Sequence, residues 1–454
     1  MRNRLRLSLV ALATAAVTAL TTGPAPAAAT DTGHLTGTLA DGATWIADVP
    51  ADWNGTLLLF SHGFGPLVAR DAPTDAVRTE LLREGYALAS SSYDPNGSMW
   101  ALNSAERDQF ATLDAVTARI GAPRRTLAVG TSMGGLVNAR IARDGTGRID
   151  GALGLCGLVA GGTDLDNYQL DAEYTLARLL LPEQQVKLVR FTSADEAAGT
   201  AQQLTAAVTA AQSTPQGRAR IALAAAFLNL PTWAPGRTAP APSDWAGQQE
   251  QQYAWFANGI LSFVEGGRYA VEQSVGGNNS WNQGVDYARL LAGSAHAPQV
   301  RALYRAAGLD LDADLDALTT GASVTADPAA VRTAARTSTA DPGPAVPLLD
   351  VHTTADNLVP VEQERRFADR VRAAGRGSLL RQAYVERQGH CTFTTAETVA
   401  ALHALEHRVT TGSWAAATPA ALQRSATASG LDGAAYVPYR PARLTVGRDR
   451  PDHG

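Results

Sequence analysis

The 454-residue sequence has little of several features that would place a protein in a particular class. Its only two cysteines, Cys156 and Cys391, exclude a disulfide-rich scaffold, although they permit one bridge in an oxidising compartment. It has no excess of positive charge, because the formal net charge is −5, and this argues against a general affinity for nucleic acid or anionic lipid. After the N-terminal segment, no apolar run is long enough to cross a bilayer, and no internal repeat stands out.

The N-terminal segment, residues 1–29, has the composition of a secretory signal peptide. Three arginines precede an apolar run at residues 7–20, and small residues around Ala25 follow it. The apolar run is too short and too rich in alanine and threonine for a comfortable membrane span. We therefore expect a secreted mature protein that has lost this segment and is not held in a membrane.

The remaining chain divides by composition into a sheet domain and a helical insertion. Short β-rich runs alternate with amphipathic helical stretches from His34 to about Ala160, as in a mostly parallel sheet with crossover helices. The expected strands are 44–49, 56–61, 87–93, 126–130 and 152–158, and the expected helices are 74–83, 104–120 and 135–143.

The later part of the chain interrupts this alternation and then resumes it. Residues 162–345 are rich in Ala, Leu, Gln and Arg, with helical stretches at 170–181, 194–211 and 218–228 and no convincing strand. Strands return at 346–351 and 379–385, with helices at 361–374 and 396–407. The sequence therefore predicts an α/β sheet domain, 30–161 and 346–410, split by an all-helical insertion. A C-terminal tail, 411–454, is expected to pack on the sheet domain.

The run Gly130-Thr131-Ser132-Met133-Gly134 joins an apolar β-run to a helical stretch. A serine hydroxyl is a weak nucleophile at its free pKa, so it must project to where a base can take its proton. A sharp strand-to-helix turn achieves this, flanking glycines allow the strained turn, and the helix N-terminus offers N–H groups to a developing oxyanion. The pattern is common in glycine-rich chains, so this turn alone leaves a simple turn as an equal alternative.

Two later segments supply a histidine and a carboxylate, each directly after an expected strand. Asp356 lies in Thr354-Ala-Asp356-Asn, and His390 lies in Gln388-Gly-His390-Cys. A general base for a serine must be a histidine that a carboxylate holds in one tautomer. Asp350 is a rival acid, but it lies inside an apolar run. His352 is a rival base, but it stands too close before Asp356 to fit the chain order serine, acid, histidine.

These motifs, together with His62-Gly63-Phe64-Gly65 after the expected strand 56–61, resemble the α/β-hydrolase superfamily over about residues 34–161 and 346–409. The resemblance implies that Ser132 is the nucleophile, His390 the base and Asp356 the acid, and that the amides of Met133 and Phe64 form the oxyanion hole. Within the superfamily the chain is similar to secreted bacterial esterase- or peptidase-like members, in which residues 162–345 would be a helical cap. The segment around Phe64 is not of the three-glycine type, which leaves the second oxyanion donor open.

The resemblance also assigns roles to His62 and to the two cysteines. It makes His62 a structural residue and not the base. It places Cys156, at the end of the strand after the nucleophile helix, and Cys391, beside His390, at the same edge of the sheet. We therefore expect a Cys156–Cys391 disulfide that restrains the histidine loop, with two buried thiols as the alternative.

Other chemistry-bearing residues have simpler interpretations. His403 and His407 form a His-x-x-Glu-His pattern that can bind zinc, but no third ligand is suggested nearby, so we expect an ordinary amphipathic helix and no metal site. Asp94 is expected to form a turn. The aromatic residues of the insertion either line an acyl pocket or form the insertion's own core; they are Trp233, Trp245, Trp255, Phe256, Phe263 and Trp281.

The sequence therefore predicts a secreted serine hydrolase that cleaves carboxylic esters, small or polymeric, through an acyl-enzyme and without a cofactor. An exported serine peptidase of the aminopeptidase kind, using the same triad, is the first alternative. A non-catalytic binding protein on a hydrolase scaffold is the second. The triad does not separate ester from amide cleavage, because the pocket decides which substrate is held.

Overall fold

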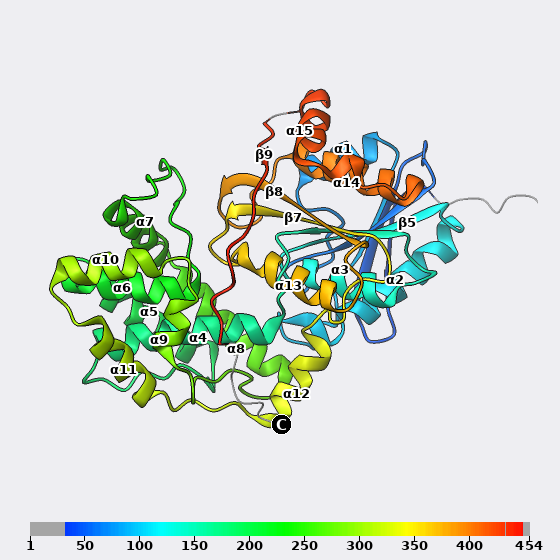
Figure 1. Cartoon of the computed structure of the whole chain (residues 1–454). Coiled ribbons are helices and arrows are strands. Elements are labelled where there is room, and N and C mark those ends of the chain that lie inside the picture. The colour runs from blue at the N-terminus through cyan, green and yellow to red at the C-terminus, as the bar shows by residue number, and fades with distance from the viewer. Residues whose placement is uncertain (1–31, 432, 448–454) are drawn as a thin grey trace, which may run out of the picture.

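A nine-stranded sheet forms the centre of the described chain (Figure 1). The structure, a computed structural model, describes residues 32–431 and 433–447, so the predicted signal peptide lies outside the described residues. The strand order is β1-β2-β4-β3-β5-β6-β7-β8-β9, in which the pairs β1–β2, β2–β4 and β8–β9 are antiparallel and all others are parallel. The strands are β1 (Gly33–Thr38), β2 (Thr44–Val49), β3 (Thr56–Ser61), β4 (Ala87–Ser91), β5 (Arg125–Thr131), β6 (Gly151–Leu155), β7 (Leu348–Ala355), β8 (Leu380–Gln388) and β9 (Tyr436–Val437).

The inner strands β3, β4 and β6 are buried along their whole length because helices cover both faces of the sheet. All six residues of β3, which reads Thr-Leu-Leu-Leu-Phe-Ser, are buried, whereas only Leu35 is buried in the edge strand β1. Helices α1 (Asp75–Arg83), α14 (Thr395–Thr411) and α15 (Pro419–Ala428) cover one face. Helices α2 (Ala105–Ile120), α3 (Met133–Asp144) and α13 (Glu362–Ala373) cover the other. The predicted α/β-hydrolase fold is confirmed.

Between β6 and β7 the described chain forms a helical insertion that lies to one side of the sheet in Figure 1. Five of its nine described helices begin at a side chain that caps the first free N–H groups. Ser193 caps α5, and Thr214, followed by a proline at the first helical position, caps α6. The helices are α4 (Gly162–Leu180), α5 (Ala194–Ala211), α6 (Pro215–Leu228), α7 (Trp245–Ala257), α8 (Ile260–Val275), α9 (Tyr287–Ala292), α10 (Ala297–Ala307), α11 (Leu311–Gly321) and α12 (Pro328–Thr337).

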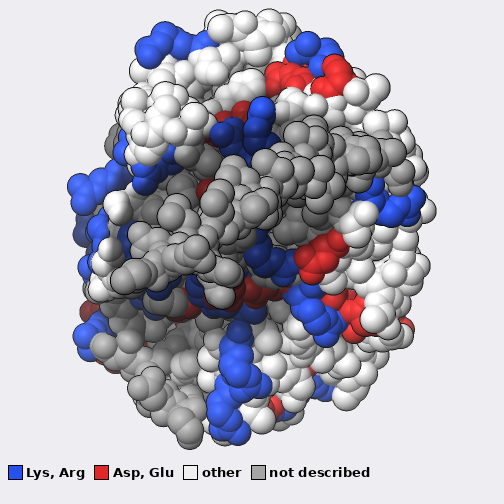
Figure 2. Space-filling view, turned by 90° about the vertical axis from the view of Figure 1, so that its right-hand side faces the viewer, with Lys and Arg blue, Asp and Glu red and all other residues white. Residues whose placement is uncertain are grey.

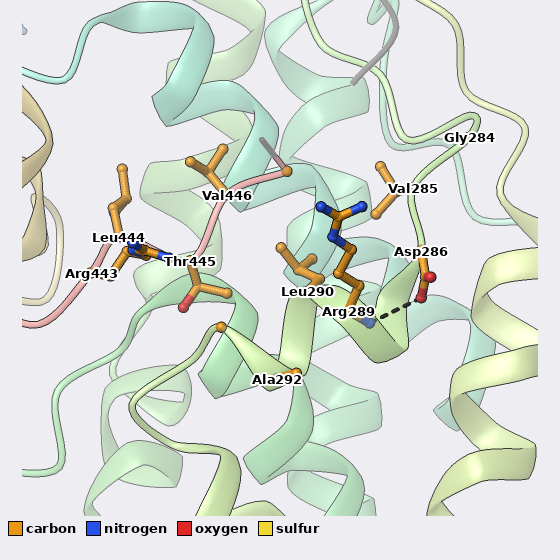
Figure 3. Close-up of a pocket in the computed structure, with 12 residues that line it drawn as sticks. Gly284, Val285, Asp286, Arg289, Leu290, Ala292, Arg443, Leu444, Thr445 and Val446 are labelled. Atoms are coloured by element: carbon orange, nitrogen blue, oxygen red, sulfur yellow. Dashed lines mark hydrogen bonds between the residues drawn. The ribbon is translucent and has the colours of Figure 1, made fainter. Parts of the chain in front are cut away.

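The C-terminal tail contacts both the sheet domain and the insertion. After α15, β9 pairs with β8, and the chain then runs down to the insertion (Figure 1). There the side chain of Asn229 donates to the carbonyl of Thr445 and accepts from its amide, at 3.1 and 2.7 Å. Figure 3 shows residues 443–446 beside α9, where they border a surface hollow. None of the three predicted triad residues lines this hollow.

The C-terminal ends of four predicted strands are wrong by two residues or more, and two strands, β1 and β9, are not predicted. The strands expected at 346–351 and 379–385 continue to Ala355 and Gln388. The strand expected at 152–158 ends at Leu155, and the strand expected at 87–93 ends at Ser91. Cys156 and Tyr93 have left-handed backbones, with φ of 49° and 62°, and such residues end regular pairing. The edge strand β1 is too polar and glycine-rich to be recognised from its pattern.

Charged side chains of both signs are spread over the surface. On the face shown in Figure 2, basic and acidic groups are interspersed within a larger uncharged surface. Within 32–431 and 433–447, no helix combines the length and apolar character needed to cross a membrane.

Candidate active site

Ser132 lies on a sharp turn between β5 and α3. Its φ of 57° and ψ of −125° are strained for a residue with a side chain. The turn needs the two glycines around it. A Cβ on Gly134 would lie 1.9 Å from the carbonyl oxygen of Ser61, and a Cβ on Gly130 would lie 2.1 Å from the carbonyl oxygen of Gly134. Only glycine fits at these positions, because the helix packs directly on the neighbouring backbone.

The structure brings the three predicted triad residues together at the carboxyl ends of the parallel strands. His390, in the loop after β8, has its Nε2 2.8 Å from Ser132 Oγ. Its Nδ1 lies 2.7 Å from Oδ2 of Asp356, which directly follows β7. The side chain of His390 is 16% exposed and that of Asp356 is fully buried, so a substrate can reach the serine and histidine but not the carboxylate.

The environment of Asp356 favours the carboxylate form. Its Oδ1 accepts the amides of Leu358 and Val359, each at 2.9 Å. Burial alone would raise the pKa of this carboxyl, but the imidazoles of His390 and His352 outweigh burial and hold the pKa well below its usual range. Asp356 therefore stays ionised at neutral pH and can stabilise a positive charge on His390.

The rival residues lie outside the Ser132–His390–Asp356 chain. Burial inside β7 raises the pKa of Asp350, and neither of its carboxyl oxygens has a hydrogen-bond partner. The two nitrogens of His352 contact the Val359 carbonyl and the Glu364 carboxylate, at 2.8 and 3.0 Å. His62 is buried and stacks on Tyr93 with 4.1 Å between ring centres, as expected of a structural residue.

The two cysteines form the expected disulfide, with 5.4 Å between their Cα atoms. Cys156 follows β6 and Cys391 follows His390, so the bond joins the end of one strand to the histidine loop. Both residues have positive φ, and Cys391 Sγ lies 3.5 Å from His390 Nε2. Among the described residues, these two sulfurs and His390 are the one group with metal-ligand spacing, but disulfide sulfurs are not thiolates.

The His-x-x-Glu-His pattern is used for packing. His403 Nε2 lies 2.8 Å from Glu84 Oε2, which ties α14 to the end of α1, and His407 is exposed on the same helix. The contact with Glu84 raises the pKa of His403, against the effect of burial. An ion pair between two helices therefore accounts for this histidine.

A small pocket opens beside Ser132 and His390, between the sheet domain and the insertion. Most of its lining is apolar, and Phe64 meets Phe263 edge to face with 5.6 Å between ring centres. Besides the serine and histidine, two polar residues line it, Asp166 and Gln169 of α4. The other apolar lining includes Trp100, Leu158, Val271 and Leu358.

Sequence reasoning found only part of this lining. Phe263 lines the pocket, whereas Phe256, Trp255 and Trp281 are buried elsewhere and do not line it. Asp166 and Gln169 were not expected. Their spacing of three residues puts them on one face of a helix, but the sequence does not tell which face meets the sheet domain.

The two expected oxyanion donors lie close to the serine. Met133 is the first residue of α3, where an amide has no acceptor within its own helix. A Cβ on Gly63 would lie 3.1 Å from Cβ of Ser132, so the segment that carries Phe64 runs directly beside the nucleophile. Phe64 also lines the pocket.

Comparison with known proteins identifies the family. No protein-family model matches the sequence. The o-phthalyl amidase of Xanthobacter agilis is 30% identical over 427 residues, which cover 87% of this chain and 91% of the amidase. The chain belongs to the family of this amidase.

Solved structures similar to this member of the amidase family include two esterases. Feruloyl esterase B from Aspergillus oryzae has a TM-score of 0.43 and 12% identity, over 84% of the chain and 80% of the esterase. A second esterase from Aspergillus oryzae has a TM-score of 0.40 and 13% identity, over 82% and 78%. With its sheet and its family relationship, the chain is an enzyme of the α/β-hydrolase type.

Proposed function

We propose that the chain is a serine hydrolase that forms an acyl-enzyme on Ser132. The observation that carries the proposal is the continuous chain from Ser132 Oγ through His390 to Asp356, with links of 2.8 and 2.7 Å. In this mechanism Nε2 of His390 accepts the hydroxyl proton while Oγ attacks the carbonyl carbon of the substrate. Nδ1–H donates to Asp356, which holds the tautomer and stabilises the imidazolium. The amides of Met133 and Phe64 hold the oxyanion.

The second half of the reaction uses the same histidine. Protonated His390 gives its proton to the leaving nitrogen or oxygen as the tetrahedral intermediate collapses, and an acyl ester of Ser132 remains. Water, deprotonated by His390, then attacks the acyl carbon and releases the carboxylic acid. No cofactor enters these steps, because the bonds broken and formed are those of acyl transfer.

The family relationship favours an amide bond over the ester bond that the sequence analysis predicts. The relative at 30% identity is an amidase, whereas the triad geometry suits both bonds. We therefore propose amide hydrolysis as the main activity, with esters of the same acids as faster-reacting, less specific substrates.

The pocket supports a small, largely apolar acyl group, such as an aromatic one, that carries one polar substituent. Asp166 is 1% exposed, and neither carboxyl oxygen makes a hydrogen bond, although the Asn279 amide is near enough to lower the pKa. Burial outweighs the attraction of Arg268 and raises the pKa of Asp166 to about 6. A buried carboxylate without a donor is costly, so a donor on the substrate would be bound strongly here.

The mechanism is tested with a fluorophosphonate probe and matched substrates. Wild-type protein should be labelled at Ser132, whereas S132A should not be labelled and should lose turnover of p-nitrophenyl esters and of anilides. An unlabelled wild-type protein would favour the non-catalytic binding protein. If the protein hydrolysed esters but no anilide or amide of any acyl group, the proposed activity would be that of an esterase.

The contribution of Asp166 to substrate binding is tested separately with benzoyl and hydroxybenzoyl anilides. D166N should lower kcat/KM for hydroxybenzoyl substrates about tenfold or more and leave the benzoyl substrate nearly unchanged. An equal loss for both substrates would remove Asp166 from the specificity assignment.

Export to an oxidising compartment is the proposed localisation. The disulfide fits such a compartment, and the composition of residues 1–29 fits a cleaved signal peptide. Sequencing the N-terminus of protein recovered from the culture medium should find a start near residue 30. Retention of intact protein in the cytoplasm would contradict this localisation.

A further inference from the structure

A second histidine, His352, lies next to the triad acid Asp356. His352 is in β7, is fully buried and lies away from the pocket lining. Its Nε2 is 2.8 Å from the carbonyl oxygen of Val359 and 3.5 Å from Oδ2 of Asp356. Its Nδ1 is 3.0 Å from Oε1 of Glu364 in α13.

The partners of His352 determine where its protons are. A carbonyl oxygen only accepts hydrogen bonds, so Nε2 must carry a proton to bond Val359. The other nitrogen faces Glu364, whose second oxygen accepts from the Gln382 amide at 2.5 Å. A Glu364 carboxylate would accept from Nδ1 as well, and the ring would then carry a proton on each nitrogen.

The electrostatic surroundings agree with a charged ring. Burial alone would lower the pKa of His352, but its contacts with Asp356 and Glu364 outweigh burial and raise the pKa to about 10. The other titratable groups that face this cluster are Asp350 in β7, Glu362 in α13 and Tyr384 in β8. Burial raises the pKa of all three, and Tyr384 therefore stays uncharged near neutral pH.

The same ring is connected to the triad in two ways. Oδ2 of Asp356 lies between two imidazoles, His390 at 2.7 Å and His352 at 3.5 Å. In addition, His352 binds the carbonyl of Val359, and the amide of Val359 donates to Oδ1 of Asp356. The hydrogen bond from His352 therefore holds the 356–359 loop, which positions the Asp356 carboxylate toward His390.

We propose that His352 is a positioning residue of the triad: a buried imidazolium, paired with Glu364, that fixes the 356–359 loop and sets the proton affinity of His390 through Asp356. The part that concerns His390 rests on the proposed function. The charge state of His352 does not.

The charge state is tested in the wild-type protein by NMR of the imidazole nitrogens after labelling histidine with nitrogen-15. H352Q identifies the signal by its loss. We expect both nitrogens of His352 to keep the shifts of an imidazolium at pH 8.5. A neutral pattern, with one protonated and one bare nitrogen, would overturn the proposal whether or not the protein is a hydrolase.

The link to His390 is tested by the pH dependence of Ser132 labelling with the fluorophosphonate. A nearby positive charge disfavours a second one, so H352Q should move the midpoint of the acid limb up, and E364Q should move it down. Each displacement should be about one pH unit, as expected for a unit charge within about 10 Å at an effective dielectric of 20. The double variant H352Q/E364Q should return close to the wild-type midpoint.

The pattern of these displacements separates positioning from simple damage. Variants that only loosen the fold would lower the labelling rate without moving the midpoint in opposite directions. Unchanged midpoints, or displacements of the same sign in both single variants, would refute the assigned role. Absence of any labelling in the wild type would refute the proposed function instead, and the NMR result would still stand.

Discussion

Removing the Cys156–Cys391 disulfide should lower the free energy of unfolding mainly through the unfolded chain. The two cysteines are 235 residues apart in sequence, so their bond closes a loop that contains the whole insertion. In the chain-entropy description, a loop of this length lowers the entropy of the unfolded chain by about 18 cal/mol/K, equivalent to about 5 kcal/mol at 25 °C. This is of the same order as the whole stability of many domains.

The measurement is urea unfolding of C156A, C391A and the double variant, with recovery of the native signal on dilution as the check of reversibility. Either single substitution breaks the bond, so each single variant should lose most of the free energy of unfolding that the disulfide contributes. Adding the second substitution should cost only about 1 kcal/mol more, for lost packing. A double variant that loses less than about 1 kcal/mol at an unchanged denaturant slope would refute the entropic reasoning. Two single losses that simply add would show that side-chain packing, and not the cross-link, stabilises this edge of the sheet.

Three further substitutions have defined outcomes. D356N should lower kcat about 10⁴-fold with intact folding, because the amide stabilises the wrong tautomer of the histidine; a loss below about tenfold in steady-state assays would contradict a catalytic Asp356. The raised pKa of His352, about 10, means that its contribution to stability is fully present below about pH 6.5 and is lost as pH rises towards 10. The stability difference between wild type and H352Q should therefore shrink over that range in urea titrations, and a constant difference would argue against a charged ring. G134A should abolish labelling of the serine and destabilise the fold, because its Cβ would meet the Ser61 carbonyl at 1.9 Å, whereas the matched control G199A, in open space on α5, should be neutral or slightly stabilising by thermal melting.

The sheet and the candidate triad could be predicted because the order of strands, helices and motifs along the chain is visible in the sequence, even where exact strand ends are not. Ser132, Asp356 and His390 each follow an expected strand, and the carboxyl ends of parallel strands share one edge. The resemblance to the α/β-hydrolases placed Cys156 beside Cys391, and the structure has that bond.

The parts that sequence reasoning missed depend on packing between distant segments. Nothing local marks Asp166 or Gln169 as pocket residues, because their exposure depends on how α4 meets the sheet domain. The left-handed backbones of Tyr93 and Cys156, which end two strands early, occur at residues that rarely adopt that conformation. The contact between His352 and Asp356 depends on how the chain turns after β7, and the four-residue spacing of the two residues does not predict this turn.

The bonds between Asn229 and Thr445 change how the insertion is attached to the rest of the molecule. An insertion joined only by its entry and exit segments can swing about one axis that runs through both. Here the tail leaves the far edge strand β9, and its Thr445 bonds Asn229, the C-cap of α6. It therefore works as a strap that adds to the direct contacts between the two parts, such as the Arg366–Asp164 ion pair. A swing that widened the pocket over Ser132 would have to stretch or release this strap, so the mobility of the insertion is set partly by a segment that contributes no residue to the pocket.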